Sequence, residues 1–217
     1  MSEIFNLAKS IRDNVKKVII GKDNEIDLLS IALLCNGHVL IEDVPGTGKT
    51  TLVKSFALSM DCIFKRIQFT PDLLPSDITG IKYYNMKSST FEFLPGPVFS
   101  NIILADEINR ATPKTQSGLL ECMEEKQVTI EGETHILPLP FMVIATQNPI
   151  ENMGVFPLPE AQLDRFLIKI YMKYPTHEEN IDILSRFDKN NPISNLNAVT
   201  TRETLLQAQK SVTNVYV

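Results

Sequence analysis

The chain has 217 residues, of which 43% are hydrophobic and 22% charged, and its formal net charge is −5. This length is enough for a substantial buried core and allows one large domain, or one domain plus a fragment. The negative charge and the lack of Lys/Arg runs argue against a protein devoted to nucleic-acid binding. Apolar runs are too short to span a membrane and no secretion segment begins the chain, so we expect a cytoplasmic protein.

The cysteines also indicate a reducing compartment. Cys35, Cys62 and Cys122 are odd in number and widely spaced, which is typical of free thiols. The three histidines are equally scattered, and neither residue type has the spacing of a metal site. We therefore expect no Cys/His metal centre.

Up to about residue 174 the chain alternates short apolar strands with amphipathic helices, which predicts an α/β sheet covered on both faces. Thr112 as N-cap and Pro113 in the first turn mark the start of one of these helices. Helices are expected near 3–17, 23–36, 48–60 and 112–125, and strands at 38–42, 62–69, 101–106, 140–147 and 166–171.

Two intervals, 70–100 and 126–139, do not fit this alternation and are rich in turn residues. Both are predicted to be β-hairpin insertions. In the first, residues 80–84 and 90–94 would pair across 85–89. In the second, strands at 128–130 and 135–137 would flank a Gly-containing tip at 131–134.

After Pro175 the pattern is helical alone. Thr176 and Glu179, and again Thr200 and Glu203, have the spacing of a capping box. We therefore expect a core domain at 1–174 and part of a helical unit at 175–217. Because the chain stops on apolar residues without a helix stop signal, we expect this unit to be truncated.

The run EDVPGTGKT at 42–50 lies between an apolar strand and a helical pattern, which is the layout of a phosphate-binding loop. Gly46 and Gly48 allow backbone N–H groups to close on a phosphate, and Lys49 adds a full charge at the helix N-terminus. Thr50 is then placed to put its hydroxyl on Mg²⁺. The alternative is an ordinary Gly-rich turn between a strand and a helix.

A second apolar strand, IILA at 102–105, ends in the adjacent carboxylates Asp106 and Glu107. Asp106 would hold Mg²⁺ through water, and Glu107 would orient and deprotonate the water that attacks a γ-phosphate. The alternative is a strand that ends in two solvated acids. With the phosphate loop upstream, the pair favours a nucleotide hydrolase over a transferase.

Three further residues are candidates. Asn148 closes a strand and could reach the γ-phosphate or the attacking water, although Asn-Pro pairs are often simple turns. Arg165 could enter the phosphate site of a neighbouring subunit, and the alternative is an ion pair, for example with Asp164. Arg110 is a rival for this intersubunit role, and the residues alone do not rank the two.

Taken together, these motifs resemble the MoxR family of AAA+ ATPases. The matching runs are EDVPGTGKT at 42–50, LADEINRA at 104–111, ATQNP at 145–149 and LPEAQLDRF at 158–166. The resemblance implies a P-loop NTPase (AAA+) αβα sandwich with a five-stranded parallel sheet, two β-hairpin insertions and the start of a C-terminal helical lid. In that sheet the strand that ends at Asn148, the sensor strand, would lie between the two phosphate-motif strands. It also accounts for Asp43, which replaces the first Gly of the usual G-x-x-x-x-G-K-S/T pattern and would point away from the ligand or toward a cation.

The resemblance assigns roles by position, with ATP and Mg²⁺ as ligands. Thr50 and Asp106 would serve the metal, and Glu107, Asn148, Arg165 and Lys49 would be the hydrolytic base, first sensor, arginine finger and phosphate ligand. The nucleotide would contact Val18, Ile19, Ile20 and Gly21 around adenine, and Pro45, Gly46, Thr47, Gly48, Lys49, Thr50 and Thr51 around the phosphates.

The resemblance further implies a Mg²⁺-dependent ATPase that works as a chaperone-like motor on a partner protein, often beside a von Willebrand A-type protein. An arginine acting in trans requires a ring, typically a hexamer. The family's second sensor, an arginine in the lid, would lie beyond the end of this chain.

Two other functions stay open. One is a DNA-acting AAA+ helicase: Glu131 and Glu133 at a hairpin tip argue against it, whereas Lys82 and Lys87 on the other hairpin favour it. The other is a regulator that senses nucleotide without turnover, and the presence of Glu107, Asn148 and Arg165 argues against that.

Overall fold

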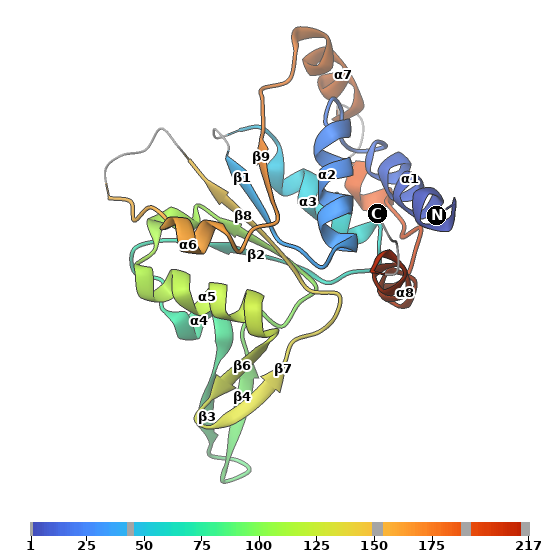
Figure 1. The fold of residues 1–217 in the computed structure, drawn as a ribbon. Coiled ribbons are helices and arrows are strands. Elements are labelled where there is room, and N and C mark those ends of the chain that lie inside the picture. Colours follow the sequence, from blue (N-terminus) through green and yellow to red (C-terminus); the bar gives the residue numbers. More distant parts are fainter. Residues whose placement is uncertain (1, 43–45, 149–153, 188–191, 214–217) are drawn as a thin grey trace.

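A computed structural model describes residues 2–42, 46–148, 154–187 and 192–213 (Figure 1). Its centre is a five-stranded parallel sheet, as predicted, with strand order β2-β5-β8-β1-β9. The strands are β1 (Val39–Glu42), β2 (Phe64–Gln68), β5 (Ile102–Asp106), β8 (Met142–Gln147) and β9 (Ile168–Tyr171). Strand β8 lies between β5 and β1, the two strands that lead into the phosphate motifs.

Helices cover both faces of this sheet (Figure 1). Alternate strand residues face opposite sides, so Ile102 and Leu104 belong to one apolar core and Ile103 and Ala105 to the other. The helices are α1 (Ser2–Val15), α2 (Asp23–Leu34), α3 (Lys49–Leu58), α4 (Pro75–Thr79), α5 (Pro113–Glu125), α6 (Glu160–Leu163), α7 (His177–Phe187) and α8 (Arg202–Val212), with 3-10 turns at Ile108–Arg110 and Pro192–Asn195.

Both predicted hairpins are present, and they extend together beyond α4 and α5 (Figure 1). The first joins β3 (Gly80–Asn85) to β4 (Thr90–Pro95), directly after α4, and the second joins β6 (Gln127–Ile130) to β7 (Glu133–Ile136). The Phe93 and His135 rings stack with centroids 4.2 Å apart, and Lys82 Nζ lies 2.6 Å from Glu133 Oε1. The hairpins therefore contact each other through an aromatic stack and an ion pair.

The tip of the second hairpin is shorter than predicted. Ile130 pairs with Glu133, so the turn consists of Glu131 and Gly132 alone, with φ of 49° and 84°. Two positive φ values in a two-residue turn suit the right-handed twist of the flanking strands. The prediction of a four-residue tip at 131–134 was therefore wrong, because a strand pattern does not show how far pairing continues.

One of the two predicted capping boxes is confirmed. The Thr176 N–H donates to Glu179 Oε2 at 2.8 Å, and the Glu179 N–H donates to Thr176 Oγ1 at 3.3 Å. The other prediction was wrong: Thr201, not Thr200, is the N-cap of α8 and accepts from the Thr204 N–H, and the third helical residue is Thr204 rather than a glutamate. The Val199 N–H donates to the Ser59 carbonyl at 2.9 Å, so a contact with distant backbone fixes the chain just before α8. No described helix is long and apolar enough to cross a membrane.

Candidate functional site

The predicted phosphate loop lies between β1 and α3. Gly46 and Gly48 have φ of 91° and 84°, a region that non-glycine residues rarely adopt, and no atom lies within 4 Å of where a Cβ would stand on either. Gly48 is the N-cap of α3, and Lys49 is the first residue of that helix. The backbone thus has room for a ligand at the positive end of a helix. Asp43 and Pro45 lie outside the described residues.

Asp106 is buried at the end of β5 and contacts three side chains. Its Oδ1 accepts from Thr146 Oγ1 at 2.7 Å and lies 3.5 Å from Lys49 Nζ. Its Oδ2 accepts from Arg66 Nη2 at 2.6 Å and Arg66 Nε at 3.1 Å. Burial raises the pKa of Asp106, but the hydrogen bonds from Thr146 and Arg66 and the charge of Lys49 outweigh it, and the net shift is downward. The carboxylate therefore stays ionised.

Glu107 has a different environment from its neighbour. Its φ is 57°, and its backbone N–H donates to Thr146 Oγ1 at 2.8 Å. Its Oε2 accepts from Gln68 Nε2 at 2.8 Å and Arg110 Nη1 at 3.2 Å. Because the Thr146 hydroxyl bonds the Asp106 carboxylate and the Glu107 backbone N–H, strand β8 helps to position both acids.

These groups line one groove with a volume of about 460 Å³. Its wall is made of Gly46, Gly48, Lys49, Thr50, Thr51, Arg66, Gln68, Asp106 and Glu107. A hydroxyl and a carboxylate are oxygen ligands of the kind Mg²⁺ prefers, and lysine and helix N–H groups suit phosphates. The residues present thus fit a nucleotide phosphate with Mg²⁺.

No motif in the sequence points to Arg66, Gln68 or Thr146 as site residues. One signal was available: Arg66 and Gln68 are two residues apart near the carboxyl end of β2, so their side chains lie on the same face of the sheet. Their importance required knowing that β2 is the neighbour of β5. Thr146 is fully buried on β8, and only strand order places it beside Asp106.

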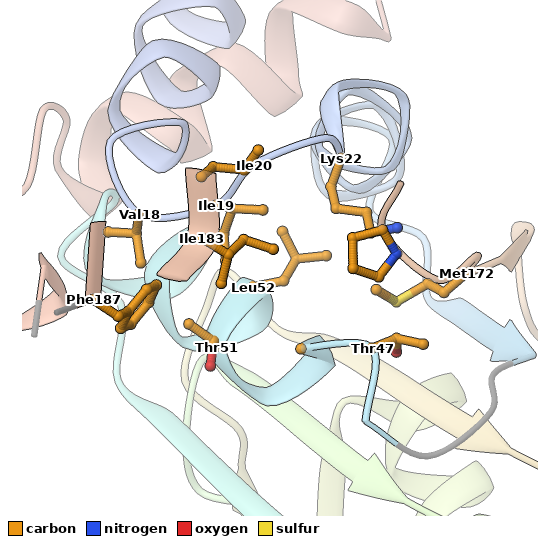
Figure 2. Close-up of a pocket in the computed structure, with 12 residues that line it drawn as sticks. Val18, Ile19, Ile20, Lys22, Thr47, Thr51, Leu52, Met172, Ile183 and Phe187 are labelled. Carbon is orange, nitrogen blue, oxygen red and sulfur yellow. The ribbon is translucent and has the colours of Figure 1, made fainter. Parts of the chain in front are cut away.

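An apolar cavity of about 140 Å³ adjoins the phosphate loop (Figure 2). Six predicted nucleotide contacts line it: Val18, Ile19, Ile20, Thr47, Gly48 and Thr51. The other lining residues are Lys22, Leu52, Met172, Pro175, Ile183 and Phe187, the last two from α7. The fold therefore brings the segment before α2, the phosphate loop and α7 around one space that suits an apolar ring.

Gly21 lies beside this cavity rather than in its lining. Its φ is 70°, and a Cβ there would stand 2.1 Å from Glu179 Oε1. Glycine at this position thus lets the capped start of α7 approach the segment before α2.

Asn148 directly follows β8 and is half-buried. The residue before it, Gln147, donates through Nε2 to Glu42 Oε1 at 2.7 Å, and Lys169 Nζ lies 2.6 Å from the same oxygen. The end of β8 is therefore tied to the strand that enters the phosphate loop. Asn148 is not among the residues that line the groove.

The two candidate arginines occupy different places. Arg110 binds Glu107 within its own chain. Arg165 follows α6, forms an ion pair with Glu124 of α5 and donates to the Leu120 carbonyl at 3.3 Å. The residues that line the groove do not include Arg165, so the fold does not bring it to the phosphates of its own chain.

Comparison with known proteins agrees with this architecture. A model of the ATPase family associated with various cellular activities (AAA) matches residues 38–168. An uncharacterized Bacillus subtilis protein, YeaC, is 54% identical over 96% of this chain and 65% of its own length. The Mycobacterium tuberculosis chaperone MoxR1 is 46% identical over 100% of this chain and 56% of its own length.

A solved structure extends the likeness to the fold. The crystal structure of a candidate ATPase from Cytophaga hutchinsonii has a TM-score of 0.90 and 46% identity, covering 98% of this chain and 64% of that one. The chain thus spans between half and two thirds of the length of each of these relatives. The family match, the glycine loop and the paired acids at the sheet edge lead to one conclusion: the chain belongs to the AAA ATPases and is MoxR-like.

Proposed function

We propose that this chain binds ATP with Mg²⁺ and hydrolyses the bond between the β- and γ-phosphates, which gives ADP and phosphate. The observation that carries the proposal is the convergence of the glycine loop, Lys49, Asp106 and Glu107 on one groove beside an apolar cavity. Residues 1–174 would form the nucleotide-binding core, and 175–217 would be part of a helical lid.

Each residue has a role that follows from its position. Lys49 and the backbone of Gly46 and Gly48 would hold the phosphates. Thr50 and Asp106 would hold Mg²⁺, which when bound would neutralise phosphate charge. Glu107 would take the proton of the attacking water, and the Thr146 hydroxyl keeps its backbone in place. Asn148, at the end of β8, would contact the γ-phosphate or that water.

A ring is the second part of the proposal. Arg165 is exposed and lies away from the groove of its own chain, which supports action on a neighbouring subunit. An arginine supplied in this way can raise the rate by about 10³ to 10⁵. We infer a hexamer from the family resemblance, and Arg110, bound to Glu107, is the weaker candidate for the intersubunit role.

The partner of the ATPase is proposed from the name of a relative. The Mycobacterium tuberculosis relative is named chaperone MoxR1, which supports a chaperone-like motor that remodels or matures a partner protein, with a von Willebrand A-type protein as one candidate partner.

The three free cysteines support a cytoplasmic location. Of the two lysines that left a DNA-acting function open, Lys82 forms an ion pair with Glu133 within the chain, whereas Lys87 is exposed.

The test is the ATPase rate against protein concentration, with sedimentation of the same samples with and without Mg²⁺-ATP. It should be made for this chain and for one extended through the lid. Activity that rises with assembly would support the ring ATPase. Tight ATP binding by a persistent monomer without turnover, even in the extended chain, would overturn hydrolysis in favour of a nucleotide-sensing regulator.

A further inference from the structure

Arg66 is a cation inside the groove that no motif predicts. It lies on β2, the edge strand beside β5, and its side chain runs toward the carboxyl end of the sheet. Both Nε and Nη2 donate to Asp106 Oδ2, at 3.1 Å and 2.6 Å. Nη2 also donates to Gln68 Oε1 at 2.5 Å, so the guanidinium connects the two acidic side chains through Gln68.

The contacts of Asp106 leave little room for a metal. A carboxylate has two oxygens with about four acceptor sites. Oδ2 already receives two N–H groups from Arg66, while Oδ1 receives the Thr146 hydroxyl and faces Lys49. Mg²⁺, bound directly or through one of its waters, needs one of these acceptor positions. A guanidinium and a divalent cation also repel each other at such short range.

We propose that Arg66 is a positioning residue that occupies Asp106 Oδ2 until nucleotide-bound Mg²⁺ displaces it, so that metal and nucleotide bind together. This inference rests on the proposed function, because it takes Asp106 as the metal carboxylate. Arg66 thereby excludes free divalent cations from the empty groove and keeps the buried charge of Asp106 compensated.

The exposure of the two partners shows which one can move. The side chain of Arg66 is 46% exposed, whereas that of Asp106 is 4% exposed. Arg66 can turn away without opening the core, whereas Asp106 is held by Thr146 and the strand around it. Arg66 lines the same groove as Gly46 and Lys49, so the phosphates of a bound nucleotide would attract the displaced guanidinium.

The first test measures metal binding without nucleotide. Mn²⁺ is titrated into the nucleotide-free chain, and the free ion is followed by electron paramagnetic resonance, for the wild type, Arg66→Gln, Arg66→Lys and Lys65→Gln. Lys65 is the matched control, since strand alternation turns this neighbouring cation to the other face of β2. Circular dichroism and thermal unfolding show whether each variant is folded.

We expect Arg66→Gln to bind Mn²⁺ about three- to tenfold more tightly than the wild type, because a competing cation is removed from a buried carboxylate. Arg66→Lys should lie between them, since lysine keeps the charge but not the paired donors. Lys65→Gln should match the wild type. Equal Mn²⁺ affinities of folded Arg66→Gln, Arg66→Lys and wild type would overturn the inference.

The second test compares ATP affinity in Mg²⁺ and in EDTA, using a fluorescent ATP analogue. Without metal, loss of Arg66 leaves the negative charge of Asp106 without its guanidinium partner. That charge would repel the phosphates, so Arg66→Gln should bind the analogue more weakly than the wild type. With Mg²⁺ the difference should shrink, because only the wild type must then move Arg66 away from Asp106 before the metal can bind. An unchanged ratio of the two affinities would contradict the inference. Failure of the wild type to bind the analogue at all would instead contradict the proposed function.

Discussion

The two adjacent acids at the end of β5 differ in how firmly they are held. Asp106 is buried with donors on both oxygens, whereas Glu107 is partly exposed and its carboxylate contacts the side chains of Gln68 and Arg110. A metal ligand benefits from a fixed position, and a general base must approach a water molecule and exchange a proton with it. The environments therefore match the roles proposed for the two residues.

Glu107→Gln should leave ATP binding intact and reduce turnover by about 10² to 10⁴, because the amide keeps the shape of the side chain but cannot accept the proton. ATP affinity and phosphate release are measured on the extended chain. Glu121→Gln, an exposed acid on α5, is the control and should leave both unchanged. Wild-type turnover in Glu107→Gln would remove its assignment as the base.

The buried imidazole of His38 should make the stability of the fold depend on pH. Its Nδ1 accepts from the Val143 N–H at 3.0 Å, and Nε2 lies 3.2 Å from the Met123 carbonyl, which fits a neutral ring. Burial, with a smaller effect of Lys126, lowers its pKa to about 4 against the opposing effect of the Met123 carbonyl. Between pH 6.5 and 4 the unfolded state therefore binds the proton more readily than the folded state.

The contribution of neutral His38 to stability should be complete above pH 6.5 and be lost as pH falls toward 4. Urea unfolding at pH 7, 5 and 4 would measure it, with His38→Gln as the comparison. We expect the wild type to lose on the order of 3 kcal/mol more than the variant over this range. Parallel pH profiles of the two proteins would show that His38 does not titrate in this way.

At the scale of elements, α7 is the helix that closes the apolar cavity. It begins with the capping box of Thr176 and Glu179 beside Gly21, and Arg186 Nη1 donates to the Lys16 carbonyl at 2.6 Å. Both ends of α7 thus contact the segment before α2. These contacts hold Ile183 and Phe187 over the space proposed for adenine (Figure 2).

Phe187→Ala should weaken ATP binding about fivefold, because removal of the ring takes away part of the apolar wall, worth about 1 kcal/mol. Leu184→Ala is the control on the same helix, since Leu184 is 72% exposed and does not line the cavity. Calorimetric titration with an ATP analogue measures both. Equal ATP affinities of the two variants would show that Phe187 does not contribute to nucleotide binding.

At the scale of the whole molecule, the site stands at the carboxyl edge of the sheet, as is usual for parallel α/β folds. Arg165 lies outside this edge and is bound to Glu124 on α5. A single chain therefore has an incomplete set of the groups proposed for catalysis. Completion by a neighbouring subunit would make activity a property of the assembly.

Mixing two inactive variants tests this directly. Arg165→Ala and Glu107→Gln should each be inactive alone, but a mixture should recover activity, because an Arg165→Ala subunit keeps its base and receives Arg165 from its Glu107→Gln neighbour. Phosphate release is measured over a range of mixing ratios in the extended chain. A mixture as inactive as its components, with assembly confirmed by sedimentation, would contradict action in trans.

Much of this molecule is predictable from local patterns. The apolar runs and turn residues identify the five sheet strands, and the glycine loop and the Asp106–Glu107 pair are recognisable without a fold. Family resemblance adds the strand order. The errors fall at element ends, as at Thr201 and the Glu131–Gly132 turn, because pairing and capping depend on contacts with distant backbone.

The sequence by itself therefore determined the elements and the residues that would meet a phosphate, since both depend on short-range spacing. Only the tertiary structure decided what surrounds those residues. Arg66 and Gln68 reach the acids because β2 pairs with β5, and Thr146 joins them because β8 lies on the other side. These contacts join residues about 40 positions apart in the chain, and the register between parallel strands is set by the packing of helices on both faces of the sheet.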